Sequence, residues 1–176
     1  MVFSEKNPRD AKKIEEAIIF LVTRMLESEY NPKLVVLHSV RMGMYLYNYN
    51  YGPDIVKAAI LHDIIENSDT TVDEIREQFG DKVAQLVQAN TRDNTAGDRT
   101  AQGEECLQRC LEYGKDALIV KTADMLENSY DVVDPITAKE WSEFWIAEMR
   151  HMLDVSRPVI GDEPVWQGLN QRCLKL

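Results

Sequence analysis

Four residues of this chain combine the side-chain types of a divalent metal site. His62 and Asp63 are adjacent within a strongly apolar run that begins at Ala59, while His38 lies upstream and Asp124 downstream. A charged group buried in such a run must be paired, protonated or bound to a metal. Imidazole nitrogens and carboxylate oxygens suit a divalent transition metal, and hydrolytic sites keep positions open for water. The four residues therefore predict a one-metal hydrolytic site.

Two polar residues after the His-Asp pair extend this predicted site. Glu66 lies four residues past His62, on the same face of a helix, where it could handle a proton of a metal-bound water. The alternative is a solvated acid at a helix end. Asn67 either hydrogen-bonds a substrate or ends the helix. Arg41 lies one turn beyond His38, so it either reaches the same cleft or is an ordinary surface arginine.

Lys121, Asp124 and Asn128 are spaced i, i+3 and i+7, so one stripe of one helix carries all three. A cation, a metal ligand and an amide on one stripe would suit a phosphate held against a metal. Lys121 and Asn128 are therefore candidate substrate-binding residues. The alternative is an ordinary amphipathic helix with a polar face.

The elements that would position these residues are helices, because glycines and prolines fall between the stretches with helical spacing of apolar residues. Helix starts are indicated by Asn7-Pro8, Asn31-Pro32 and Gly52-Pro53, by the capping-box pairs Thr71/Glu74 and Thr137/Glu140, and by Asp81. The helix after Pro53 is expected to contain the His-Asp pair. Residues 91–99 are expected to form a loop, residues 101–112 and 116–132 helices, and Pro158 the end of the helix that Thr137 begins. The expected fold is all-α, in a single domain over residues 1–176.

Composition and charge exclude several classes of function. The 176 residues suit one globular domain, and the net charge of −10 with no Lys/Arg block argues against binding a nucleic acid polymer or an anionic membrane. No apolar run approaches the ~20 residues that span a bilayer, and the N-terminus lacks the apolar core of a signal peptide, so we expect a cytoplasmic protein. Cys106, Cys110 and Cys173 form no CxxC pair and are expected to be reduced thiols rather than zinc ligands. A homo-oligomer is compatible with the sequence.

The arrangement of His38, His62-Asp63 and Asp124 resembles the metal-binding signature of the HD superfamily of phosphohydrolases. Over roughly residues 34–145, the segments 62–71 and 121–128 look like the hydrolase domain of the RelA/SpoT family and its small stand-alone relatives. The resemblance implies a helical HD-domain fold and removal of 3′-pyrophosphate from guanosine polyphosphates with Mn²⁺. It also implies that these four residues hold the metal.

The resemblance further implies that Glu66 activates or orients the water and that Asn128 contacts the nucleotide. This sequence departs from the family pattern in its recognition segments. Asn67 stands where the family has an aspartate, and residues 29–38 lack the basic segment with Gly-Pro-Tyr that grips the guanine nucleotide. Trp145 and Met149 stand where the stand-alone relatives place an arginine and a tyrosine. Two other functions therefore stay open: an HD-type nucleoside monophosphate phosphatase, and a non-catalytic metal or nucleotide sensor on the same scaffold.

Overall fold

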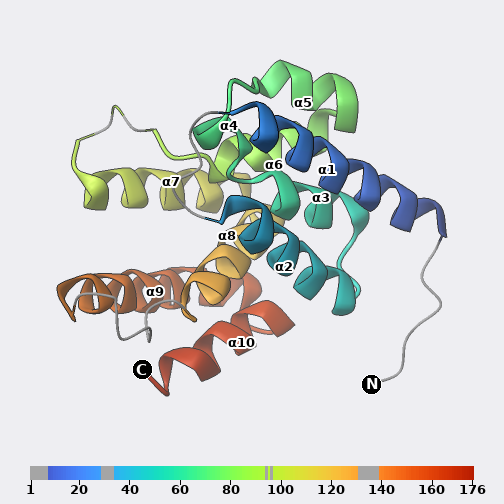
Figure 1. Cartoon of the computed structure of the whole chain (residues 1–176). Helices are drawn as coiled ribbons and strands as arrows, with labels where there is room; N and C mark the ends of the chain where they lie inside the picture. Colours follow the sequence, from blue (N-terminus) through green and yellow to red (C-terminus); the bar gives the residue numbers. More distant parts are fainter. Residues whose placement is uncertain (1–7, 29–33, 94, 96, 131–138) are drawn as a thin grey trace. The chain divides into compact units, whose positions relative to one another are not determined.

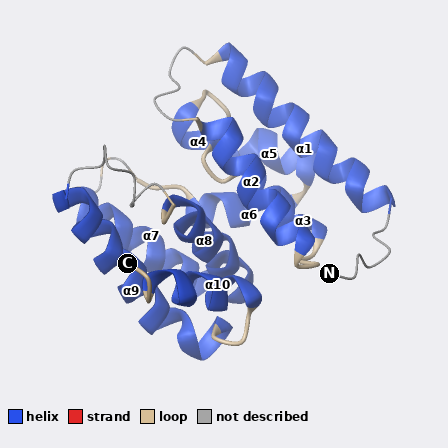
Figure 2. Ribbon diagram, turned by 60° about the horizontal axis from the view of Figure 1, so that its bottom comes forward, coloured by secondary structure: helices blue, strands red, loops and turns tan. Residues whose placement is uncertain are grey.

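The computed structural model describes residues 8–28, 34–93, 95, 97–130 and 139–176, which contain helices and no strand (Figure 1, Figure 2). The all-α expectation is confirmed. The expected capping residues Asn7, Asn31 and Thr137 lie outside the described residues. Among the described helices, none is both long enough and apolar enough to cross a membrane. The backbone divides into two compact units, Met1–Gln88 and Ala89–Leu176, and a single domain stays a prediction.

The first unit holds α1 (Pro8–Glu27), α2 (Val35–Asn48), α3 (Pro53–Leu61), α4 (Ile64–Asn67), α5 (Val72–Phe79) and most of α6 (Asp81–Asn90). Its centre is α3, in which every residue from Ile55 to Leu61 is buried, with α1 and α2 packed against it. Gly43 lets α2 approach α3 closely, because a Cβ at this position would overlap the Ile60 side chain. This approach brings the helix that carries His38 against the helix that leads into His62.

The start of α5 has the capping box that the sequence predicts. The Thr71 hydroxyl accepts a hydrogen bond from the Glu74 backbone N–H at 3.3 Å, and the Glu74 carboxylate accepts one from the Thr71 backbone N–H at 2.8 Å. The helix ends at Gly80, whose φ of +92° lies in the region that favours glycine. This end of the segment is therefore fixed by local chemistry.

The second unit contains α7 (Arg99–Tyr113), α8 (Lys115–Asn128), α9 (Lys139–Ile160) and α10 (Pro164–Cys173). Residues 117–126 of α8 are all buried, and α7, α9 and α10 pack around this helix. The expected end of a helix at Pro158 was wrong by two residues, because α9 runs to Ile160 with the proline in its last turn. There the ring removes a single backbone donor close to the end of the helix. The expected helix over 116–132 ends earlier, at Asn128.

Candidate functional site

The His-Asp pair forms a turn between two helices, where the sequence predicts one continuous helix. Leu61 is the last residue of α3, and Asp63 precedes α4 with φ −94° and ψ −2°. Two side chains bond to backbone carbonyls at this turn. His62 Nδ1 lies 2.9 Å from the Ala59 carbonyl oxygen, and Asn67 Nδ2 donates to the Asp63 carbonyl oxygen at 2.8 Å. The His62 contact gives the Ala59 carbonyl a partner other than the backbone N–H four residues on, which favours a break at this point, while the Asn67 bond lies across α4.

The hydrogen bond to Ala59 sets the tautomer of His62. A carbonyl oxygen can only accept, so Nδ1 carries a hydrogen, and Nε2 is the nitrogen that the neutral ring would offer to a metal. Metal-binding histidines are commonly oriented by this kind of contact on the other ring nitrogen. His62 Nε2 lies 3.2 Å from Asp63 Oδ1, and both side chains are buried. The pair thus places an imidazole nitrogen beside a carboxylate oxygen.

His38 completes a group of three predicted ligands in the first unit. It is half-buried on α2, and its ring centroid lies 5.3 Å from that of His62. His62 therefore lies between two other predicted ligands, with the His38 ring on α2 near its own ring and the Asp63 carboxylate beside its Nε2 atom. This donor set fits a divalent transition metal with positions left for water or substrate.

The other predicted residues of this unit surround the turn. Glu66 is half-buried on α4, and Asn67 is buried at the end of the same helix. Arg41 is exposed on α2, one turn after His38. The roles assigned to Glu66 and Arg41 stay predictions. Asn67 differs from them, because its side-chain amide bonds to the backbone of Asp63.

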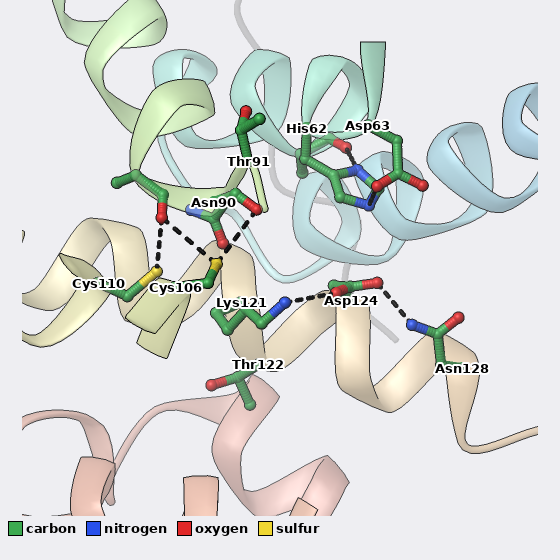
Figure 3. A network of polar contacts seen from close by, with 12 residues as sticks. His62, Asp63, Asn90, Thr91, Cys106, Cys110, Lys121, Thr122, Asp124 and Asn128 are labelled. Atoms are coloured by element: carbon green, nitrogen blue, oxygen red, sulfur yellow. Dashed lines mark hydrogen bonds and ion pairs between the residues drawn. The ribbon is translucent and has the colours of Figure 1, made fainter. Parts of the chain in front are cut away.

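In the second unit, Lys121, Asp124 and Asn128 form one connected network on α8 (Figure 3). Lys121 Nζ lies 3.0 Å from Asp124 Oδ2, and Asn128 Nδ2 donates to Asp124 Oδ1 at 2.6 Å. Both carboxylate oxygens of Asp124 are therefore held in place by side chains of its own helix. The expected stripe is confirmed, although the two candidate substrate-binding groups each direct a donor to the aspartate.

Lys121 is buried, yet its surroundings favour the charged form. Burial acts to lower the pKa of Lys121, but the Asp124 carboxylate and then Cys106 act to raise it, and the net shift is upward. The ammonium and the carboxylate thus stabilise each other as ions within the second unit.

The two cysteines of α7 are buried against the end of α6 (Figure 3). The Cys106 thiol contacts the carbonyl oxygens of Ala89 and Asn90 at 3.6 and 3.4 Å, and the Cys110 thiol contacts that of Ala89 at 3.3 Å. A hydrogen bond from Cys110 lowers the pKa of Cys106 to about 6, whereas the pKa of Cys110 is raised. All three cysteines are free thiols, as expected.

One group of residues was missed by sequence reasoning. Arg92 and Arg99 each place a guanidinium carbon near the Trp145 ring, at 5.5 and 5.4 Å from its centroid. Phe144 contacts the same ring edge-on. Both arginines lie in residues 91–99, which were expected to form a loop, and Arg99 is the first residue of α7. Their basic character was the available signal, but the meeting with Trp145 depends on tertiary packing.

A family model described as HD domain matches residues 22–129, which include all four predicted metal ligands. The guanosine-3′,5′-bis(diphosphate) 3′-pyrophosphohydrolase of Aquifex aeolicus is 28% identical over 124 residues, 69% of this chain and 18% of that protein. The human enzyme of that name, MESH1, is 34% identical over 94 residues, 53% of this chain and 51% of its own length. The chain thus spans about half of the MESH1 relatives and less than a fifth of the Aquifex protein.

Solved structures show the same fold. A structure described as a metazoan ortholog of SpoT that hydrolyzes ppGpp has a TM-score of 0.78 at 17% identity, covering 98% of both chains. A Listeria monocytogenes protein has a TM-score of 0.68 at 18% identity, covering 78% of this chain and 94% of the other. At 17% and 18% identity these structures show only that the fold is shared. The family assignment therefore rests on the sequence match to the family model. The chain belongs to the HD domain family.

Proposed function

We propose that this chain is a metal-dependent phosphohydrolase that removes 3′-pyrophosphate from guanosine polyphosphates. The observation that carries the proposal is the position of His62, whose ring lies near that of His38, has its Nε2 atom 3.2 Å from Asp63 Oδ1 and contacts the Ala59 carbonyl oxygen through Nδ1. The names of the relatives from Aquifex aeolicus and human supply the substrate class. Residue types and the family resemblance add Asp124 as a fourth ligand, and Mn²⁺ is the proposed metal.

In this proposal each predicted site residue has a separate role in hydrolysis. A bound divalent ion would supply a water of lowered pKa and a Lewis acid for a phosphate oxygen. Glu66 would hold the proton of the attacking water, because it is a half-buried carboxylate on α4, directly after the His-Asp turn, and is not one of the predicted ligands. Lys121 and Arg41 would offset the negative charge of the phosphates, and Asn128 would contact the nucleotide.

The second unit adds a feature that suits a nucleotide. The guanidinium groups of Arg92 and Arg99 lie over the Trp145 ring and bring two positive charges together in an otherwise acidic chain. Such a pair could receive the phosphates of a small ligand, whereas a nucleic acid polymer needs a more extended basic surface.

The test is product analysis with Mn²⁺-loaded protein and a panel of guanosine polyphosphates and nucleoside monophosphates. We expect release of pyrophosphate from the polyphosphates. Asp63→Ala should lose both bound metal and turnover, and Glu66→Ala should keep the metal but lose most of its turnover. Asp69→Ala is the matched control, since this acid is exposed in the segment just after α4.

Three results would contradict the proposal in different ways. Full activity of the wild type after chelation would remove the metal from the mechanism. Release of single phosphate from monophosphates would indicate the phosphatase alternative. Tight nucleotide binding with no product of any kind would indicate the sensor.

A further inference from the structure

Asn67 is held at both its side chain and its backbone. Its side-chain amide donates to the Asp63 carbonyl oxygen at 2.8 Å, and its own carbonyl oxygen accepts a hydrogen bond from the Ser28 hydroxyl at 2.8 Å. Ser28 directly follows α1, so this second bond ties the end of α4 to the end of another helix. Asn67 is only 7% exposed, which keeps water from competing strongly for these bonds.

The contact with Asp63 requires a hydrogen-bond donor at position 67. A carbonyl oxygen accepts hydrogen bonds and cannot donate them, so the partner at position 67 must carry a hydrogen. An aspartate at this position would be ionised at neutral pH and would offer only acceptors. Its carboxylate would face the carbonyl oxygen of Asp63 and repel it. The presence of asparagine here thus has a local structural consequence that the family's usual aspartate could not reproduce.

The bond acts on a residue of the predicted metal site. Asp63 places its Oδ1 atom 3.2 Å from His62 Nε2, and the backbone of the turn sets the position from which this side chain extends. We propose that Asn67 is a positioning residue: it fixes the Asp63 backbone so that the carboxylate stays beside His62, and it transfers no proton. This inference deepens the proposed function and rests on it for the identity of the metal site.

The experiment compares Asn67→Ala and Asn67→Asp with the wild type by titration with Mn²⁺ and by steady-state kinetics over a range of Mn²⁺ concentrations. Loss of an outer partner of a metal ligand typically weakens metal binding by about 10–100-fold. We expect a loss of this size in Asn67→Ala and a larger one in Asn67→Asp, with excess Mn²⁺ restoring most of the turnover of Asn67→Ala. Asn48→Ala is the matched control, because Asn48 is the exposed last residue of α2.

Two outcomes would overturn the inference. Asn67→Asp with unchanged Mn²⁺ affinity and higher turnover would make position 67 a site for a catalytic acid. If Asn67→Ala kept its Mn²⁺ affinity but lost turnover that excess Mn²⁺ did not restore, the amide would act directly in the reaction rather than by positioning Asp63.

A measurement on the metal-free protein separates this inference from the proposed function. The backbone NMR resonances of His62 and Asp63 should shift in Asn67→Ala and stay in place in Asn48→Ala. If the wild type bound no Mn²⁺, the proposed function would fail, and these resonances would still report on the bond. Unshifted resonances in Asn67→Ala would contradict the positioning role. Should Asn67→Asp not fold, Asn67→Ala alone decides between the outcomes.

Discussion

Replacing Lys121 by methionine should destabilise the protein strongly, because it removes the cation from a buried ion pair. Lys121 and Asp124 have side chains only 4% and 11% exposed, and their charged atoms lie 3.0 Å apart. Methionine keeps most of the volume of the lysine stem but leaves the carboxylate without its ammonium. Removing one partner of a buried pair typically costs about 3–5 kcal/mol, since the remaining charge stays in a poorly solvating environment. The Asn128 amide would still bond to Asp124, which places the expected loss toward the lower end of that range.

Urea unfolding at neutral pH in the presence of a chelator measures this effect without a contribution from bound metal. Lys115→Met is the matched control on the same helix, because Lys115 pairs with Glu163 but its side chain is 56% exposed. Solvent screens such a pair, so this variant should lose far less stability.

The double variant Lys121→Met/Asp124→Leu removes both charges and should recover most of the loss. If Lys121→Met were no less stable than Lys115→Met, the buried pair would contribute no more to the free energy of unfolding than the exposed one. If the double variant were as unstable as the single one, the loss would come from packing rather than from an uncompensated charge.

Three further predictions follow from the first unit. Gly43→Ala should lower the free energy of unfolding in urea by about 1–3 kcal/mol and weaken Mn²⁺ binding, because the new methyl group would push α2 and His38 away from Ile60 on α3. Unchanged stability and Mn²⁺ affinity would show that the two helices can move apart without cost. Thr71→Ala should lower the free energy of unfolding by about 1 kcal/mol because it removes a helix cap, whereas Thr71→Ser should keep most of this stability. The Thr71 backbone N–H lowers the pKa of Glu74, so this carboxylate stabilises the fold above its ordinary pKa of 4.5, and the contribution is lost as the pH falls through the lowered value. The melting temperature of Glu74→Gln should therefore lie below that of the wild type at pH 7 and approach it in acid; an equal difference at both pH values would contradict this.

The helical fold was predictable because its signals are local. The capping box at Thr71 and the Gly52-Pro53 start of α3 each involve residues within a turn of one another, and the structure confirms them. The stripe of Lys121, Asp124 and Asn128 was readable for the same reason. Side chains three and four residues apart on a helix are neighbours, so their contacts can be inferred before any tertiary structure is known.

The remaining features depend on contacts that spacing does not encode. The helix break at His62 is accompanied by a contact between its ring and the Ala59 carbonyl, and an unbroken helix was equally compatible with the residue types. The meeting of Arg92 and Arg99 with Trp145 joins segments far apart in the chain. The proximity of His38 to His62 was predicted from chemistry alone, and its structural cause is the approach of α2 to α3 at Gly43.

The two aspartates assigned to the metal are each followed by an asparagine at the fourth position, but the two amides act differently. Asn67 bonds to the backbone carbonyl of Asp63, whereas Asn128 bonds to the carboxylate of Asp124. A bond to the carboxylate draws on the lone pairs that a metal would use, while a bond to the backbone carbonyl does not. Asn67 therefore orients Asp63 without competing for its carboxylate, and Asp124 is oriented by donors that would compete with an ion. From this difference, metal binding should perturb the contacts of Asp124 with Lys121 and Asn128 far more than it perturbs the turn at Asp63.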